Sequence, residues 1–545
     1  MNTNLIFNIC KSFCIVLIGL ISVAEATVAP IPKGIFCMPV QGANGFPDQI
    51  LNDPRIAGLD LGDQWPDIEA TEGVYDWSTL DTQLAQAEAH GKKAVLGITS
   101  GGLNVPDWLL ADYPDIQTFT FIDTNPNHST YGQPVTIPVF WDPIFLAKKI
   151  ALIQAAAARY AAHSSIAVVA CSFANATTGD WNIPNAPEDI AHWQAAGYTT
   201  ELMVNAGETL IDATMAAFPN QNVVLPIGRN TTGLDPSVDY LSETVVDYAA
   251  TTYGRFITTR FSLSATTDDP SIDASSLDNW GVLFDQCPNV AGQMLWNVSG
   301  DNTYRMNGGV PGNKQTILLK AITTGAHYGM QYEEIYLIDL QDATLSSVID
   351  TAKTLLTATP PPPRAPSSLN ATAGGAYVVN LTWRDNASNE LGYRIESKIG
   401  ATGTYEVLTT VGPNTTAPTI SNLIEGTQYY YRLQGVNAGG RSAYSNEKSV
   451  TTVLISPGSL SLQALSSSKV RLTWRDKSAT ETGFTIERSP LTDTNFTQIA
   501  TVGANTTSFT DTGLSRSTKY YYRVRAYNGY TTSAYSGEKH VTTLP

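Results

Sequence analysis

Residues 146–173, LAKKIALIQAAAARYAAHSSIAVVACSF, decide the fold of the larger part of this chain. The first part, 146–162, is rich in alanine and long unbranched side chains, which favour a helix. The last part, 166–173, is a short run of mostly small and β-branched apolar residues, typical of a strand buried on both faces. A helix that leads directly into a buried strand indicates a parallel sheet covered by helices.

The same alternation of strand and helix extends through residues 30–358. Seven further strands are predicted at 34–38, 57–61, 94–98, 223–227, 255–261, 292–296 and 333–337. Further helices are predicted at 80–90, 202–217, 314–324 and 346–356. Eight such units predict an α/β TIM barrel, (β/α)8, over residues 27–356. A doubly wound sheet is the alternative, although neither GxGxxG nor a P-loop follows the first strand.

Composition and charge narrow the classes of function. The chain has 545 residues, of which 43% are hydrophobic and 15% charged, as expected of globular domains. Asp and Glu number 49 against 32 Lys and Arg, a net charge of −17. Such a surplus repels phosphate backbones and anionic lipid, so nucleic acid is not expected as a partner. The acidic surplus lies within 27–358, whereas 359–545 has more basic than acidic residues, which indicates a modular protein.

Residues 1–26 are predicted to be a signal peptide. Lys11 precedes an apolar run at 13–23, and Ala24-Glu25-Ala26 has the spacing of a cleavage site. The alternative is a buried helix of the mature protein. No later run approaches the length of a membrane span, so we expect a secreted protein without membrane insertion in its mature form.

Three cysteines remain after the predicted signal: Cys37, Cys171 and Cys287. None lies in a CxxC or histidine-rich setting, so small buried apolar residues are expected rather than a disulfide or a metal site. No metal and no organic cofactor is predicted.

The second half repeats itself after a proline-rich linker at 357–366. Trp383 recurs as Trp474, and the tyrosine triplet at 429–431 recurs at 520–522, each 91 residues further on. Short strands with alternating polar and apolar residues and one tryptophan per repeat are typical of a β-sandwich. Two sandwiches are therefore predicted, at 367–453 and 456–545.

Both repeats resemble bacterial fibronectin type III modules. The resemblance is carried by Trp-Arg-Asp at 383–385 and 474–476, each followed by Gly-aromatic-x-Ile-Glu. It implies all-β sandwiches that serve as spacers or adhesive arms.

The run Trp65-Pro-Asp-Ile-Glu-Ala-Thr-Glu-Gly-Val-Tyr-Asp-Trp77 follows the second predicted strand. With Pro106-Asp107-Trp108 further on, it resembles glycoside hydrolases of the large retaining (β/α)8 clan, including β-galactosidase-like members. Within the run, Glu69 and Glu72 are expected to shape the loop rather than to act on a substrate.

The chain departs from that clan at the two positions where the clan's catalytic glutamates lie. Counted in chain order, the predicted strand at 166–173 is strand 4, that at 292–296 is strand 7 and that at 333–337 is strand 8. Clan members place Asn-Glu at the end of strand 4 and a second Glu at the end of strand 7. Asn175-Ala176 follows strand 4 here, and Gln293 or Asn297 stands at strand 7. Activity therefore requires other carboxyl groups.

Three acids are the candidate catalytic residues, since glycoside hydrolysis needs one carboxylic acid and one carboxylate. Asp180 follows strand 4 beside Trp181, Asp301 follows strand 7, and Glu334 lies in strand 8. Alternation along strand 8 turns Glu334 toward the barrel interior. Solvated loop acids remain the alternative for Asp180 and Asp301, and a buried ion pair with Arg260 for Glu334. Asp339, after strand 8, is a weaker candidate.

Aromatic and polar residues near the strand ends are candidates for binding a sugar, because an indole ring stacks on a sugar ring. The tryptophans are Trp65, Trp108, Trp141, Trp181 and Trp296, and the polar residues are Asp60, Asp63 and Arg229. Some of these tryptophans are alternatively packing anchors. Residues 107–143 form an irregular insertion suited to the wall of a cleft.

The sequence therefore predicts a secreted multidomain glycoside hydrolase, acting in carbohydrate metabolism on a polysaccharide or oligosaccharide through two barrel carboxylates. The alternative is a catalytically inactive carbohydrate-binding or adhesive protein, for which the absence of the two clan glutamates argues.

Overall fold

A computed structural model describes most of the chain beyond its first 28 residues. The described residues are 29–39, 43–101, 104–123, 130–171, 187–226, 241–253, 257–265, 283–284, 286–300 and 303–545. The predicted signal peptide lies outside them.

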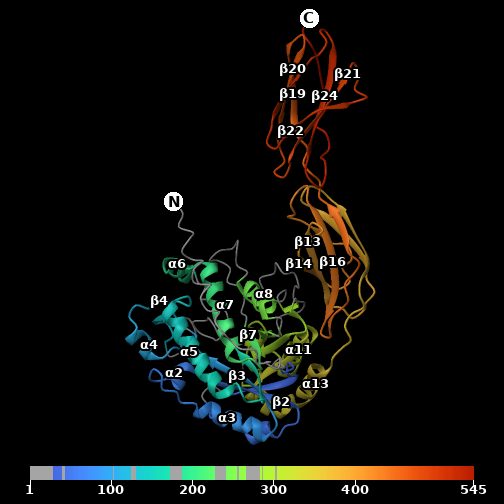
Figure 1. Cartoon of the computed structure of the whole chain (residues 1–545). Coiled ribbons are helices and arrows are strands. Elements are labelled where there is room, and N and C mark those ends of the chain that lie inside the picture. Colours follow the sequence, from blue (N-terminus) through green and yellow to red (C-terminus); the bar gives the residue numbers. More distant parts are fainter. Residues whose placement is uncertain are drawn as a thin grey trace, which may run out of the picture.

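Eight parallel strands form one closed sheet in the larger domain (Figure 1). They are β1 (Gly34–Met38), β2 (Ile56–Gln64), β3 (Lys93–Thr99), β6 (Ile166–Ala170), β7 (Asn222–Pro226), β8 (Ile257–Leu263), β9 (Val290–Met294) and β10 (Met330–Tyr336). Their order around the barrel is β1-β10-β9-β8-β7-β6-β3-β2. A strand thus occurs at each of the eight predicted places, and the ring differs from the open sheet of the doubly wound alternative.

The two faces of the sheet bury separate sets of apolar side chains. One set fills the inside of the ring: Phe36, Val95, Ala167, Val168, Val224, Ala291 and Tyr332. Residues that alternate with these, such as Ile35, Leu96 and Ile335, belong instead to the large core shared with the helices. Burial on both faces explains why the strands are nearly continuous apolar runs.

Helices surround this sheet (Figure 1). They include α3 (Ser78–Ala89), α5 (Pro143–Tyr160), α7 (Thr200–Ala217), α8 (Leu241–Tyr253), α11 (Lys314–His327) and α13 (Ser346–Thr357). Helix α5 begins at Pro143 because the Asp142 carboxylate accepts hydrogen bonds from the backbone N–H groups of Ile144 and Phe145. Asn313 caps α11 in the same way through the N–H of Thr316.

The insertion at 107–143 is more regular than predicted. It contains the short helix α4 (Asp107–Asp112) and a hairpin of β4 (Thr118–Ile122) and β5 (Pro134–Pro138). The hairpin buries Phe119 against Trp193 of helix α6 (Pro187–Ala195), with the ring centroids 3.9 Å apart. Because Phe119 and Phe121 alternate with exposed residues, the segment is a two-stranded ribbon with one apolar face.

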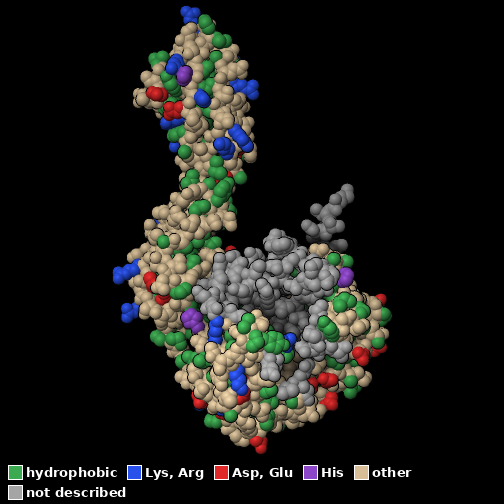
Figure 2. All heavy atoms as spheres, turned by 180° about the vertical axis from the view of Figure 1, so that it is seen from behind, with side chains coloured by type: hydrophobic (Ala, Val, Ile, Leu, Met, Phe, Trp, Pro, Cys, Tyr) green, Lys and Arg blue, Asp and Glu red, His purple; other side chains and the backbone are tan. Residues whose placement is uncertain are grey.

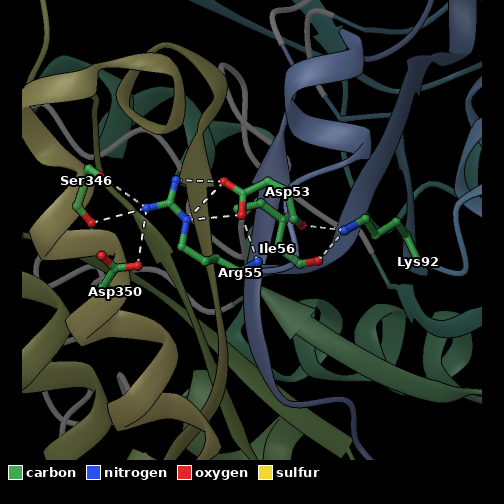
Figure 3. Close-up of polar contacts among 6 residues, drawn as sticks. All are labelled: Asp53, Arg55, Ile56, Lys92, Ser346 and Asp350. Atoms are coloured by element: carbon green, nitrogen blue, oxygen red, sulfur yellow. Dashed lines mark hydrogen bonds and ion pairs between the residues drawn. The ribbon is translucent and has the colours of Figure 1, made fainter.

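Polar contacts at the start of β2 join this strand to helix α13 and to the residue that precedes β3 (Figure 3). The Arg55 guanidinium donates to Asp53, to the Ser346 hydroxyl at 2.9 Å and to Asp350 at 3.3 Å, and so joins β2 to α13. The Lys92 ammonium donates to the carbonyl oxygens of Asp53 and Ile56, both at 2.7 Å.

The C-terminal part consists of two all-β sandwiches. In the first, β11 (Ser367–Ala373), β12 (Val379–Arg384) and β15 (Thr419–Ile420) face β13 (Gly392–Ile399), β14 (Glu406–Val411), β16 (Gln428–Asn437), β17 (Gly440–Arg441) and β18 (Lys448–Thr451). In the second, β19 (Gly458–Ser466), β20 (Lys469–Arg475) and β23 (Ser508–Thr512) face β21 (Gly483–Pro490), β22 (Thr497–Gly503), β24 (Lys519–Tyr527) and β25 (Lys539–Thr542). Trp383 and Trp474 lie in the two cores, as predicted.

The first sandwich packs on the barrel at the end where β9 and β10 begin. The Cys287 thiol, before β9, donates to the carbonyl oxygen of Asn437 at 3.1 Å. Leu391 and Val436 of the sandwich belong to the same apolar core as the barrel helices. The two sandwiches thus form an arm that rises from the barrel, with Lys and Arg side chains on its visible face (Figure 2). No helix within the described residues is long and apolar enough to cross a membrane.

Candidate active site at the carboxyl end of the barrel

Glu334 lies inside the barrel, as its place in the strand predicted. Tyr332, two residues earlier, belongs to the interior cluster, and Ile335 belongs to the outer core. Glu333 points outward, since its carboxyl oxygen would be 2.3 Å from a β-carbon placed on Gly325 of α11. Alternation therefore directs Glu334 and Tyr336 inward. The Glu334 side chain is 0% exposed, and a carboxyl group buried to this extent requires polar surroundings or a function.

The neighbouring strands place aromatic and amide side chains next to Glu334. In register with it lie Phe36 on β1 and Gln293 on β9. Gln293 is one of the two residues, with Asn297, that stand where the clan resemblance expects a glutamate, and its side-chain amide contacts the sulfur of Met38 at 2.9 Å. An amide cannot replace a carboxylate as a nucleophile, so Gln293 can only position or bind.

Trp296 follows β9 and reaches the same end of the barrel. Its ring lies 6.1 Å from that of Tyr336, two residues beyond Glu334. The Arg305 guanidinium covers the Trp296 ring at 4.0 Å, and the indole N–H has no hydrogen-bond partner among the described residues. Trp296 therefore packs beside Tyr336, at the end of the strand that carries Glu334. No signal in the sequence singled out Arg305.

Asp60 on β2 also faces the interior. Leu59 and Leu61 on either side of it belong to the outer core. An Asp60 carboxylate oxygen lies 3.8 Å from the position of a β-carbon placed on Gly97 of β3. Asp60 is half-buried, so water reaches part of its side chain.

Asp63, the other acid of β2, is not brought to Glu334. It alternates with Gly62 and turns toward the loop and helix that hold Asp67, Asp76 and Thr79. Burial raises the pKa of Asp63 above its ordinary value, and the negative charges of Asp67 and Asp76 add to the effect. Asp63 therefore faces the helical layer beside two other acids.

Trp65 and Trp108 lie in the core rather than on a cleft wall. Trp65 is 0% exposed and packs edge-on against Trp108, with centroids 6.3 Å apart. The Glu69 carboxylate accepts a hydrogen bond from the Trp65 indole at 2.7 Å, and the Glu69 carbonyl accepts one from Trp108 at 2.8 Å. Both rings thus hold the 65–77 loop together, and neither offers a face on which a sugar can stack.

Trp141 is half-buried on the hairpin side of the domain. It packs against Trp193 at 5.7 Å and against Tyr198 at 5.8 Å. The structure does not bring Trp141 to Trp296, because its partners are in and after α6.

Asp339 lies in the short helix α12 (Leu337–Gln341), which directly follows β10, and has a structural role there. Its buried carboxylate accepts hydrogen bonds from the backbone N–H groups of Val298, at 2.9 Å, and Ser299, at 2.8 Å. It fixes the loop that carries Trp296, and burial raises its pKa.

Four predicted site residues lie outside the described residues: Asp180, Trp181, Arg229 and Asp301. The same holds for Asn175 and Ala176 at the end of strand 4. Among the residues that the structure describes, no group of three or more His, Cys, Asp or Glu is arranged to hold a metal ion. Cys37, Cys171 and Cys287 are buried and form no disulfide, as predicted.

Comparison with known proteins assigns families to parts of the chain. Residues 55–200 match the model of a glycoside hydrolase family described as β-galactosidase. This match includes Asp60 and the 65–77 loop and ends before Glu334. Residues 364–451 and 456–542 each match the fibronectin type III domain.

Individual relatives are similar to the chain over about a third of its length. Titin of Drosophila melanogaster is 26% identical over 183 residues, which make up 31% of this chain and 1% of titin. A two-domain fibronectin type III segment of chicken tenascin is 17% identical and covers 33% of this chain and 99% of that segment, with a TM-score of 0.30. The FN1–FN3 domains of chicken CNTN1 are 20% identical and cover 35% of this chain and 70% of that structure, with a TM-score of 0.18.

The chain thus spans about a hundredth of the length of titin. What the family matches establish is the architecture: this chain joins a region related to the β-galactosidase family of glycoside hydrolases to two fibronectin type III domains.

Proposed function

We propose that this protein is a glycoside hydrolase that cleaves a polysaccharide or oligosaccharide at the carboxyl end of a complete (β/α)8 barrel, with Glu334 as one of its two catalytic carboxyl groups. The observation that carries the proposal is the position of Glu334: fully buried, inside the ring of strands, in a domain that includes a glycoside-hydrolase family match. Catalytic groups of such barrels come from the carboxyl ends of the strands.

The surroundings of Glu334 suit a sugar substrate. Trp296 and Tyr336 are aromatic rings at the same end of the barrel, and Gln293, in register with Glu334, provides an amide that can donate to and accept from hydroxyl groups. Asp180 and Asp301 stay candidates for the second carboxyl group, and Trp181 and Arg229 stay candidates for binding the sugar.

The test is release of reducing ends by the full-length mature chain from a panel of plant and microbial polysaccharides, together with 4-nitrophenyl glycosides. The full chain is used because Leu391 and Val436 of the first sandwich are part of the barrel's core. Glu334→Gln is expected to lower turnover at least about a hundredfold.

The matched control is Glu333→Gln, a substitution of the adjacent, equally buried residue whose side chain lies outside the barrel. It is expected to leave turnover within about threefold of the wild type. Equal losses in both variants would assign Glu334 to folding alone. Binding of a glycan without any turnover would establish the alternative, a carbohydrate-binding protein without catalysis.

We also propose that the protein is exported and that residues 1–26 are removed. The apolar run and the Ala24-Glu25-Ala26 site support this proposal. N-terminal sequencing of the protein from the culture medium should then begin at Thr27.

A further inference from the structure

We propose that Asp60 is the second catalytic carboxyl group, so that the pair is formed by strands β2 and β10 on either side of β1. This inference rests on the proposed hydrolase function and names the residue that completes it. Neither residue occupies the place of the missing glutamates at strands 4 and 7.

The strand register shows how the interior side chains are layered. Interior side chains of an eight-stranded barrel lie in layers of four, contributed by alternate strands. Phe36 on β1 and Val95 on β3 both belong to the interior cluster. In the strand register Phe36 is paired with Gly58 on β2, and Gly58 with Lys93 on β3. The interior residue of β3 is Val95, two residues after Lys93. From one strand to the second strand along, the interior layer therefore shifts by two residues toward the carboxyl end, relative to the register.

The next pair of strands shows the same advance. Val95 is paired with Val168, and Val168 with Asn222. The interior residue of β7 is Val224, again two residues beyond Asn222. The offset is therefore a property of this barrel and not of one strand.

Applied to Glu334, this offset leads to Asp60. Glu334 is paired with Phe36, and Phe36 with Gly58. Two residues beyond Gly58 is Asp60. Glu334 and Asp60 are thus neighbouring members of one interior layer, directly above the layer of Phe36 and Val95.

Distances at β3 and β6 agree with this layer. Asp60 is paired with Val95 on β3, and Val95 with Val168 on β6. The same two-residue shift beyond Val168 gives Ala170 as the next member of the layer. A β-carbon placed on Gly97, one level up, would lie 3.8 Å from the Asp60 carboxylate and 3.9 Å from the Ala170 β-carbon. Asp60 and Ala170 therefore lie side by side beneath Gly97.

The separation suits two carboxyl groups that work on one bond. Strands two apart are separated by about 10 Å at roughly 4.8 Å per strand. Inward-pointing Asp and Glu side chains shorten this distance, and carboxyl groups about 5–10 Å apart are the arrangement that glycoside hydrolases use.

Small residues lie above Asp60 on the interior face of β2 and β3. Gly62 and Gly97 follow Asp60 and Val95 on the interior face, and a β-carbon placed on Gly62 would meet only the Gly97 carbonyl oxygen among the described atoms. Larger groups, Met38, Gln293 and Tyr336, lie on the Glu334 side. A sugar entering the mouth would thus meet Asp60 on one side and Glu334 on the other.

The reaction that this pair performs is hydrolysis of one glycosidic bond. The protonated carboxyl group gives its proton to the glycosidic oxygen, and the C1–O bond breaks with its electron pair on that oxygen. The other carboxylate takes a proton from the water whose oxygen bonds to C1. One water is consumed per bond, and the proton taken from water restores the acid through solvent.

The experiment compares Asp60→Asn and Glu334→Gln with Asp63→Asn in the full-length chain, on the substrate that the wild type cleaves. Asp63 is the matched control because it lies on the same strand but faces the helical layer. Asp60→Asn and Glu334→Gln are each expected to lower kcat at least about a hundredfold, and Asp63→Asn less than about threefold, in variants that melt cooperatively. The two groups act on the same bond, so their effects are not additive. The kcat of the double variant should lie within about tenfold of that of the slower single variant.

Chemical rescue separates a catalytic role from a structural one. Sodium formate, a small carboxylate, should raise turnover by Asp60→Ala at least about tenfold and leave the wild type and Asp63→Ala unchanged. If Asp60→Asn does not fold, Asp60→Glu keeps the carboxyl group and should fold with turnover lowered at least about tenfold.

The outcomes distinguish this inference from the function on which it rests. Loss of turnover in Glu334→Gln with wild-type rates in the Asp60 variants would overturn the pairing and keep the hydrolase. Absence of turnover by the wild type on every glycan would overturn the hydrolase itself. The Asp60 and Glu334 variants could instead unfold cooperatively at a lower temperature than the wild type and keep the wild-type kcat at temperatures where they are folded. That result would show that the two residues stabilise the barrel and do not act in catalysis.

Discussion

Asn437 and Asn528 occupy the same position in the two fibronectin modules, 91 residues apart, and each side-chain amide donates once within its own module and once to the chain that precedes that module. Asn437 donates to the carbonyl oxygens of Pro361 in the linker and Asn389, both at 3.0 Å. Asn528 donates to those of Gly426, at 2.9 Å, and Thr480, at 3.3 Å. Asn389 and Thr480 are likewise 91 residues apart, so the contact within the module is the same in both. The preceding chain is held at Pro361 of the linker in one case and at Gly426 of the first module in the other.

Substitution of either asparagine is expected to loosen one joint and leave the sandwiches folded. Asn437→Ala and Asn528→Ala each remove the two hydrogen bonds described above, worth about 1 kcal/mol apiece. They also remove the side-chain oxygen that accepts from the N–H of Gly439 in the first case, and from those of Tyr530 and Thr531 in the second. Small-angle X-ray scattering should report a larger radius of gyration and a broader distance distribution than for the wild type. Asn370→Ala, at an exposed position of β11, is the control and should not change the profile. Unchanged scattering in all three variants would show that the apolar contacts alone hold the arm.

Glu425 of the first module links the two modules through hydrogen bonds. Its buried carboxylate accepts hydrogen bonds from the backbone N–H groups of Ala479, at 2.6 Å, and Ile455, at 2.9 Å. Glu425→Ala leaves both donors without their acceptor, at a cost of about 1 kcal/mol each, because Ala479 is exposed and Ile455 is half-buried, so that water can replace part of the lost contact. We expect faster cleavage near residue 455 in limited proteolysis. Arg516, the residue 91 positions further on, is exposed, and Arg516→Ala should leave the digestion pattern unchanged.

Because Glu333 is buried, we expect the free energy of unfolding of the protein to fall as the pH rises. Its side chain is 0% exposed, its oxygens have no hydrogen-bond partner among the described residues, and burial raises its pKa well above the ordinary value. Above about pH 4.5 the unfolded chain releases this proton while the folded chain keeps it. The free energy of unfolding therefore decreases by up to about 1.4 kcal/mol per pH unit until the folded pKa is reached.

Glu333→Gln should remove this dependence, because glutamine does not ionise. Thermal melts at pH 4, 6 and 8 should place the variant near the wild type at pH 4 and increasingly above it at pH 8. Glu406→Gln, at an exposed position of β14, should follow the wild type at every pH. A parallel decline of Glu333→Gln and wild type would show that another group dominates.

Glu69 is expected to stabilise the 65–77 loop without taking part in the reaction. Glu69→Ala removes the acceptor of the buried Trp65 indole and of the Gly73 N–H at 2.8 Å. Leaving the buried Trp65 N–H unpaired costs about 1–3 kcal/mol, whereas the N–H of the exposed Gly73 can bind water instead. The loss is measurable as a lower denaturant midpoint. Glu72→Ala, which removes an exposed contact with Lys148 and Tyr113, should have a smaller effect. A loss of kcat at temperatures where Glu69→Ala is fully folded would contradict this assignment.

The three cysteine thiols should not react with thiol reagents in the folded protein. Burial raises the pKa of Cys171 to about 11 and that of Cys287 to about 12, and burial together with the charge of Asp60 raises that of Cys37 further. Ellman's reagent should therefore label none of the three at pH 8 and all of them after unfolding in guanidinium chloride. Rapid labelling of one thiol in the folded chain would indicate local opening around it.

Periodicity made much of this protein predictable. The strand and helix positions follow from apolar runs and alanine-rich segments, because each element is specified by residues close together in the chain. The two sandwiches follow from a repeat that is visible by eye. The inward orientation of Glu334 follows from the two-residue period of a strand, which needs no knowledge of its neighbours.

Tertiary structure decided what these periods cannot specify. Trp65 and Trp108 follow strands like Trp296, yet the fold of the 65–77 loop buries the first two in the core. Asp60 and Asp63 are three residues apart, and alternation along β2 sends one inside the barrel and the other toward the helices. The neighbourhood of Asp60 and Glu334 exists only because the sheet closes, with β1 between β2 and β10. Local sequence sets the face of a side chain, whereas closure, a long-range packing event, sets which side chains share that face.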